Sequence, residues 1–227
     1  MIPLKDNIPT LHRPIVTVTL IAVNIAVYLY QFALGPHAEA FIWTFGAVPW
    51  EIVHQSELTP AHQTPIILTI FTSMFLHGGL FHLGSNMLFL WIFGNNVEDK
   101  LGPVHFLVFY LVSGVVAVLT FVITSPNAQV PLVGASGAVA GLLGVYIVAY
   151  PRARVLTLIW IFFFVRLVWL PAVFFLGVWF ILQLFYGLPT LAVESSSGVA
   201  YFAHIGGFVF GLAYCRFWCM RRGGFAR

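Results

Sequence analysis

Ser136 and His204 carry the chemistry of a nucleophile and its base. Ser136 lies in the string GASG (134–137) at the start of an apolar stretch, and His204 lies in AHIGG (203–207) near the start of another. A serine hydroxyl becomes an effective nucleophile when a histidine within hydrogen-bond reach accepts its proton. Each residue alone also has an ordinary structural reading, because serines in membrane helices often bond back to the preceding turn and a single histidine can be a packing residue.

The composition places these residues in a membrane. The chain has 227 residues, of which 60% are hydrophobic and only 7% are charged, and its mean hydropathy is +0.97. Soluble domains carry about 25% charged residues, so most of this surface must face lipid. The formal net charge is only +3. We expect the lipid bilayer to be a partner of this chain and nucleic acid not to be one.

Six apolar stretches approach the length of a membrane helix, which needs about 20 residues. We therefore expect an all-α polytopic membrane protein in which residues 1–227 form one domain of six transmembrane helices. The expected spans are residues 15–34, 81–98, 104–123, 135–150, 168–188 and 198–220. Because Arg166 and Pro171 interrupt a long apolar run, we interpret residues 155–167 as an interfacial segment. The outer loop at 35–80 contains Trp and is expected to lie partly at the membrane surface.

The basic residues predict the orientation of these spans. The connections at 35–65, 124–134 and 189–197 contain no Lys or Arg. All ten basic residues fall on the other side: Lys5, Arg13, Lys100, Arg152, Arg154, Arg166, Arg216, Arg221, Arg222 and Arg227. The positive-inside rule then places both termini in the cytoplasm. The short tails and the lack of a targeting sequence favour a bacterial cytoplasmic (inner) membrane. The first apolar run exceeds the roughly 7–15 residues of a signal peptide, so we prefer a retained span to a cleaved leader.

This topology brings three polar clusters to one depth near the outer face. They are the strings around Ser136 and His204, and a third string, HLGSN (82–86), that contains His82 and Asn86. The span at 135–150 covers only about 24 Å, less than a hydrocarbon core of about 30 Å. We therefore expect a short central fourth helix under a water-filled depression, which would supply water for hydrolysis.

Glycines on the fourth and sixth spans could bring Ser136 to His204. A serine side chain is short, so its helix must nearly touch the helix of the histidine, and small residues at helical spacing permit such an approach. Their alternative reading is ordinary tight packing. The glycines expected to support this packing are Gly134, Gly137, Gly141, Gly207 and Gly211.

At these residues the sequence resembles the rhomboid family of intramembrane serine proteases. The matching pieces are GASG (134–137), AHIGG (203–207), MFLHGGLFHLGSNMLFL (74–90) and GNNVEDKLG (94–102). Four ordered pieces on six expected spans are far more specific than a single GxSG string, and together they extend over nearly the whole chain.

The resemblance implies a role for each matching residue. Ser136 would attack the scissile carbonyl of a transmembrane protein substrate, and His204 would be the general base. His82 and Asn86, with the Ser136 backbone N–H, would hold the oxyanion; the two side chains are one helical turn apart and share a face. Their alternative reading is an interhelical hydrogen-bond pair. His77 also matches a family histidine, and we interpret it as structural support.

The expected site lacks a carboxylate. A catalytic triad needs an acid to orient its base, but no acidic residue lies inside an expected span, and the nearest to His204 is Glu194 in an outer loop. We therefore predict a Ser–His dyad whose imidazole is held by aromatic or backbone groups, with Gln183 standing isolated on the fifth span. The sequence departs from the family in two places. The outer loop lacks the usual Trp-Arg pair, and Ala140 stands where some members have an aromatic residue.

Two other functions compete with a protease. One is a non-catalytic rhomboid-like factor that binds or escorts membrane proteins, which would not need the dyad. The other is a transporter or channel, which the lack of charged residues along the spans disfavours. We expect no cofactor and no metal, since His77, His82 and His204 have no acidic or cysteine partner for zinc. Cys215 and Cys219 are expected to be unpaired thiols.

Overall fold

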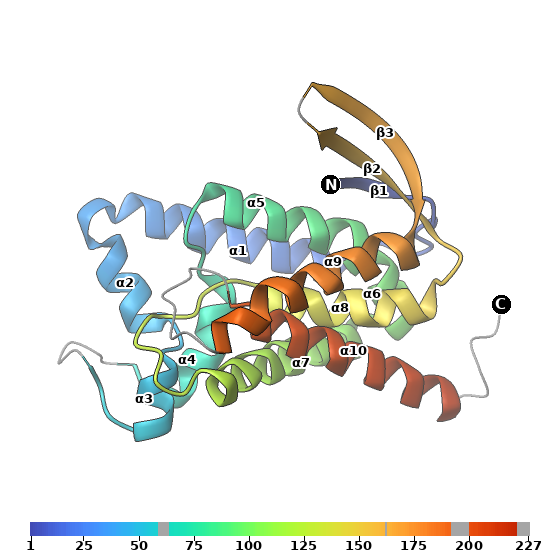
Figure 1. Cartoon of the computed structure of the whole chain (residues 1–227). Helices are drawn as coiled ribbons and strands as arrows, with labels where there is room; N and C mark the ends of the chain where they lie inside the picture. The colour runs from blue at the N-terminus through green and yellow to red at the C-terminus, as the bar shows by residue number, and fades with distance from the viewer. Residues whose placement is uncertain (59–63, 162, 192–199, 222–227) are drawn as a thin grey trace.

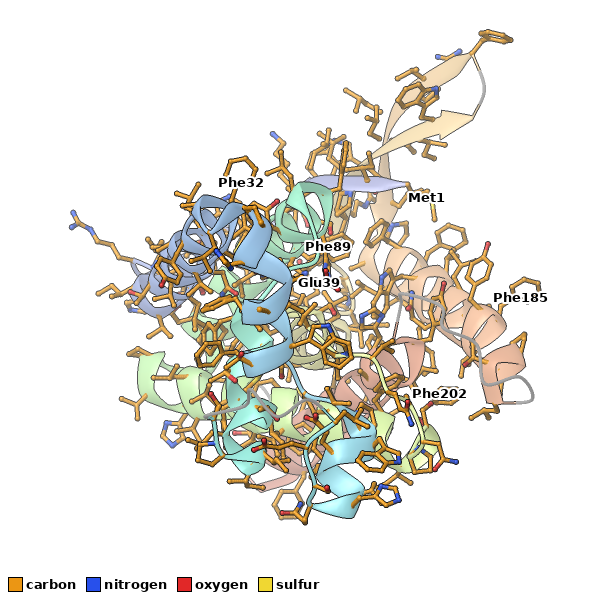
Figure 2. All side chains as sticks on the ribbon, turned by 90° about the vertical axis from the view of Figure 1, so that its left-hand side faces the viewer. Met1, Phe32, Glu39, Phe89, Phe185 and Phe202 are labelled. Carbon is orange, nitrogen blue, oxygen red and sulfur yellow. The ribbon has the colours of Figure 1, made fainter. Side chains whose placement is uncertain are left out.

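The computed structural model is mostly helical and describes residues 1–58, 64–161, 163–191 and 200–221 (Figure 1). Three of its helices are long and apolar enough to cross a membrane, at Ile15–Ala33, Pro103–Thr124 and Ala172–Leu191. A fourth candidate is a pair of helical segments, Ile66–Phe75 and Leu80–Leu101, that are bent by 79° to each other. Figure 2 shows Phe32 and Phe185 pointing away from the bundle, and these two side chains are 75% and 68% exposed. The chain is therefore a polytopic helical membrane protein.

The bundle is built from helices that run side by side (Figure 1). The full-length helices are α1 (Ile15–Ala33), α7 (Pro103–Thr124), α8 (Ser136–Ala149), α9 (Ala172–Gly187) and α10 (Tyr201–Arg221). Helix α8 is the most enclosed of them, because every residue from Gly137 to Tyr146 is buried. It packs against α7 and α10, and this explains why its sequence is apolar on all sides rather than on one face.

The second expected span is divided into several segments. Helix α4 (Ile66–Thr72) and a 3-10 turn, Ser73–Phe75, precede a loop, after which α5 (Leu80–Phe89), a π-helical turn (Leu90–Gly94) and α6 (Asn95–Leu101) follow without a gap. Helix α1 packs closely against the π-helical turn, because a Cβ added to Gly94 would lie 3.3 Å from the Thr17 side chain of α1. One turn further on, the Glu98 carboxylate accepts hydrogen bonds from the Val16 and Thr17 backbone N–H groups at 2.9 and 2.7 Å and so caps α1.

The sequence did not predict strands after the fourth span: residues 155–167 were interpreted as an interfacial segment, and the fifth span was expected to begin at residue 168. The structure contains a three-stranded antiparallel sheet of β1 (Ile2–Asp6), β2 (Arg154–Ile161) and β3 (Phe164–Pro171), so the fold is not all-α. Helix α9, which corresponds to the fifth expected span, accordingly begins at Ala172 and not at residue 168. Strands β2 and β3 are rich in β-branched and aromatic residues, which favour a pleated ladder. Because most residues on both faces of these strands are apolar, the sequence shows no clear strand alternation.

Strand β1 fixes the N-terminus to the end of the bundle. Asp6 pairs with Val155 in the sheet, and its carboxylate accepts hydrogen bonds from the Tyr146 hydroxyl at 2.5 Å and the Asn96 amide at 2.6 Å. Burial raises the pKa of the Asp6 carboxyl. The described basic residues lie on β1, α6, the β2–β3 hairpin and the last turns of α10, or in the segments just before α1 and β2, and these parts gather at this same end (Figure 1).

The described parts of residues 35–80, the loop expected on the outer face, lie at the opposite end of the bundle (Figure 1). They contain a 3-10 turn (Gly35–His37), α2 (Ala38–Phe45) and α3 (Pro49–His54) before α4. Ala47 and Leu132 exchange two backbone hydrogen bonds, and the Trp50 N–H donates to the Ala128 carbonyl at 3.1 Å. Glu51, which follows Trp50 where the family often has Arg, is 2% exposed and accepts a hydrogen bond from the Leu58 N–H. These contacts attach the loop to the segment that leads into α8.

Candidate active site

Ser136 and His204 are in hydrogen-bonding contact. The Ser136 Oγ lies 2.7 Å from the His204 Nε2, although 68 residues separate them in the chain. Ser136 is the first residue of α8, and His204 lies in the first turn of α10. The hydroxyl can donate to an unprotonated Nε2, which is the arrangement that a serine nucleophile and its general base require.

Gln183 holds the other side of the imidazole. Its Oε1 lies 2.9 Å from the His204 Nδ1, and its amide nitrogen donates to the Trp179 carbonyl at 3.3 Å. Because an amide oxygen can only accept, the Nδ1 must carry the proton, and the Nε2 is left free to accept from Ser136. Sequence reasoning treated Gln183 as isolated and expected aromatic or backbone groups in this position. Only the spacing Trp179-x-x-x-Gln183, which places both residues on one face of α9, could have indicated it.

The two residues open onto a cavity of about 730 Å³. His82 and Asn86 from α5 line the same cavity, as do Trp179 and Ala140. The centroids of the Trp179 and His204 rings are 6.1 Å apart. An aromatic ring therefore lies near the imidazole, but it comes from α9 and not from position 140, where this chain has alanine. The cavity combines a serine hydroxyl, an imidazole in contact with it and further polar groups, which is the composition expected of a substrate site.

Gly134 makes room for the His82 ring. Its φ of +124° is unfavourable for other residues, and an added Cβ would lie 2.7 Å from His82 Cε1 and 3.7 Å from Asn86 Nδ2. The Gly134 N–H donates to the Ser73 carbonyl at 2.9 Å. The Asn86 amide donates to the His82 carbonyl at 3.0 Å. The loop before Ser136 is therefore packed directly on the face of α5 that carries the two polar residues.

The glycines of α8 and α10 let the two backbones touch. A Cβ on Gly207 would overlap the Gly137 carbonyl oxygen, and one on Gly211 would overlap the carbonyl oxygen of Gly141. A Cβ on Gly137 would lie 2.5 Å from the Ala117 side chain of α7. This close approach brings the short Ser136 side chain within reach of a histidine on another helix.

Replacing Gly207 with alanine is expected to separate α8 from α10. The added Cβ meets backbone that cannot move aside, so we expect a loss of roughly 1–3 kcal/mol in stability and a weaker Ser136–His204 contact. Gly177→Ala on α9 is the matched control, because nothing lies within 4 Å of its added Cβ. Thermal unfolding in detergent should show a lower midpoint for Gly207→Ala only; equal midpoints would contradict the packing argument.

Three further expectations concern His77, Glu194 and a metal site. His77 is fully buried, and its backbone N–H and carbonyl both bond to the Gln31 amide, at 3.4 and 2.7 Å. Glu194 lies outside the described residues. Among the residues that the structure does describe, no group of three or more His, Cys, Asp or Glu side chains could hold a metal ion.

The comparison with known proteins gives the class of this fold and site. The rhomboid domain model matches residues 66–221, so the chain belongs to the rhomboid family. That range includes Ser136, His204, Gln183, His82 and Asn86.

Named relatives include proteases and an inactive protein. The chain is 33% identical over 133 residues to the rhomboid protease GluP of Bacillus subtilis, covering 58% of this chain and 24% of that protein. It is 29% identical over 131 residues to the mitochondrial rhomboid protein 1 of Saccharomyces cerevisiae, covering 53% and 38%. It is 33% identical over 119 residues to the inactive rhomboid-like protein 8 of Arabidopsis thaliana, covering 52% and 31%. The chain thus spans less than two fifths of the length of these relatives.

Proposed function

We propose that this protein is an intramembrane serine endopeptidase that uses Ser136 and His204 as a catalytic dyad. The observation that carries the proposal is the 2.7 Å contact between Ser136 Oγ and His204 Nε2 at the wall of a cavity. It is supported by the family and by a relative that is named a rhomboid protease.

The proposed reaction uses the Ser136 hydroxyl and the His204 imidazole in turn. The Ser136 Oγ attacks the scissile carbonyl carbon while its proton passes to the His204 Nε2, and a tetrahedral oxyanion forms. The Ser136 backbone N–H, at the first residue of α8, and the His82 and Asn86 side chains are proposed to stabilise that oxyanion. His204 then gives the proton to the leaving amine, and the C–N bond breaks to leave an acyl ester on Ser136. Water, deprotonated by His204, hydrolyses the ester and restores the dyad.

The proposed substrates are transmembrane or membrane-proximal segments of other membrane proteins. A continuous helix hides its carbonyls in its own hydrogen bonds, so a cleavable segment must unwind near the site. We place the site on the outer face, with α1, the α5–α6 segment, α7, α8, α9 and α10 as six spans and both termini in the cytoplasm. The short α8 would then lie at the centre, below a water-accessible depression. We propose a bacterial cytoplasmic membrane as the location. Relatives are named from both bacteria and mitochondria, so the family alone does not determine it.

A non-catalytic role in binding membrane proteins is the alternative. It is favoured by one specific observation, the similarity to a relative that is named inactive. Such a role would need the helix packing and the cavity, but not a Ser136 hydroxyl hydrogen-bonded to an imidazole. The two functions therefore make opposite predictions about the reactivity of Ser136.

Labelling with a fluorophosphonate probe tests the proposal without a known substrate. Ser136 Oγ should displace fluoride from the probe and become covalently phosphonylated, whereas His204→Ala, which lacks the base, should label at background level. Labelled protein is measured by in-gel fluorescence, and mass spectrometry assigns the modified residue. A folded protein with no labelling at Ser136 would instead support the binding role.

A further inference from the structure

The β2–β3 hairpin projects from the bundle without covering any helix along its outer half. Strand β1 pairs with β2 only as far as Leu158, so the stretch from Ile159 to Arg166 extends beyond the third strand. Figure 1 shows the hairpin leaving the end of the bundle and slanting back beside the helices. Figure 2, turned by 90°, also places it outside the outline of the helices. The outer half of the hairpin therefore stands free of the helices, on the side of the bundle that lipid would surround.

Beyond the pair of Arg154 with Pro171 at its base, one face of this hairpin consists of apolar side chains. The cross-strand pairs on that face are Leu156 with Trp169, Leu158 with Leu167 and Trp160 with Val165. Val165, Leu167 and Trp160 are 57%, 60% and 69% exposed, and Phe163 in the turn is 98% exposed. In water such a face would be an aggregation site, and β3 is an edge strand whose outer side pairs with no other described strand.

The base of the hairpin is held firmly in the protein. Val155 and Thr157, which point to the opposite face of β2, are fully buried. The Ala172 N–H donates to the Ala153 carbonyl at 2.8 Å, and β3 continues directly into α9. The exposed face is thus presented by a rigid base at the point where a membrane-spanning helix ends.

The charges on the hairpin are of one sign. Residues 152–171 include Arg152, Arg154 and Arg166 but no Asp or Glu. The Lys5 ammonium from β1 lies 5.8 Å from the centroid of the Trp169 ring on the apolar face. Basic residues near a membrane are attracted to anionic lipid headgroups, and Trp favours the boundary between headgroups and hydrocarbon.

We propose that the β2–β3 hairpin docks on the cytoplasmic leaflet of the bilayer, with its apolar face and Phe163 in lipid and its basic residues at the headgroups. The unpaired edge of β3 limits the depth, because exposed backbone groups are not tolerated in the hydrocarbon core. The hairpin then fixes the inner end of α9, the helix that carries Gln183 and Trp179. This inference rests on the six-span topology proposed above and does not depend on catalysis.

Fluorescence quenching in nanodiscs tests the proposal with the full chain. A thiol-reactive fluorophore is placed at Leu167→Cys or Phe163→Cys, in a background in which Cys215 and Cys219 are alanine. Pro151→Cys, an exposed position in the turn before β2, is the matched control. We expect the Leu167 and Phe163 labels to lose most of their fluorescence to nitroxide lipids and little to acrylamide in water, and the Pro151 label to do the reverse. Arg154→Gln with Arg166→Gln should weaken the effect of anionic lipid on the first two labels.

The design separates lipid from other occupants of the same face. Nanodiscs that hold one chain each contain no second copy, so protection that persists in them supports lipid, and protection that appears only with two chains overturns the proposal. Equal quenching of all three labels by acrylamide also overturns it. The readout needs no cleavage and no probe reaction, so it succeeds or fails separately from the assignment of Ser136.

Discussion

Ser136→Ala is expected to abolish cleavage of a single-pass model substrate by the full chain in liposomes. The substitution removes one oxygen atom, which contacts His204 and which forms the covalent bond to the acyl group in the proposed mechanism. Knocking out the nucleophile of a serine protease leaves only binding and oxyanion stabilisation, so the rate should fall by more than about 10⁴-fold. Cleavage is measured by the appearance of the two fragments on a gel over time.

A matched serine distinguishes loss of chemistry from loss of structure. Ser125→Ala changes a serine at the outer end of α7, where the serine side chain is not part of the cavity wall. We expect this variant to cleave at a rate within a few-fold of the unmodified protein and Ser136→Ala to unfold at an unchanged temperature. Undiminished cleavage by a folded Ser136→Ala protein would mean that another group is the nucleophile.

Much of the helical architecture could be predicted from hydropathy. The expected spans at 15–34 and 104–123 correspond to helices Ile15–Ala33 and Pro103–Thr124, because long apolar runs bounded by Pro, Gly and polar residues leave few alternatives. The sheet could not be predicted in the same way. Apart from Thr157 and Arg166, the run from Val155 to Leu170 is apolar on both faces, so it shows neither the alternation of a half-buried strand nor a helical stripe.

The contact between Ser136 and His204 could be predicted from the sequence, whereas the group that orients the imidazole could not. Both residues stood at one depth of the expected topology beside glycines, and the Gly207–Gly137 approach is a backbone contact that such spacing favours. Gln183 is different, because a single amide on an apolar helix has no periodic signal. Its contact with His204 depends on the rotation of α9 about its own axis, which only tertiary packing determines.

Gln183 is expected to act as a positioning residue, so Gln183→Leu should lower kcat with little change in KM. Leucine has a similar volume but cannot accept from the His204 Nδ1, which lies 2.9 Å from the amide oxygen. A buried donor left unsatisfied costs about 1–3 kcal/mol, and the ring is then free to rotate or to exchange tautomers. Because this cost falls on the reactive orientation of the imidazole, we expect the turnover rate to decrease roughly 5- to 150-fold.

Two further variants separate this role from simple packing on α9. Gln183→Glu keeps an acceptor oxygen in the same place and should restore most of the lost rate, whereas Leu182→Ala, at a neighbouring position that is 40% exposed, should have almost no effect. Nitrogen-15 spectra of the His204 ring give an independent readout, with the proton on Nδ1 in the unmodified protein and a mixture of tautomers in Gln183→Leu. An unchanged tautomer together with a reduced rate would assign Gln183 to packing instead, and the imidazole would then have to be oriented by Trp179, whose ring centroid lies 6.1 Å away.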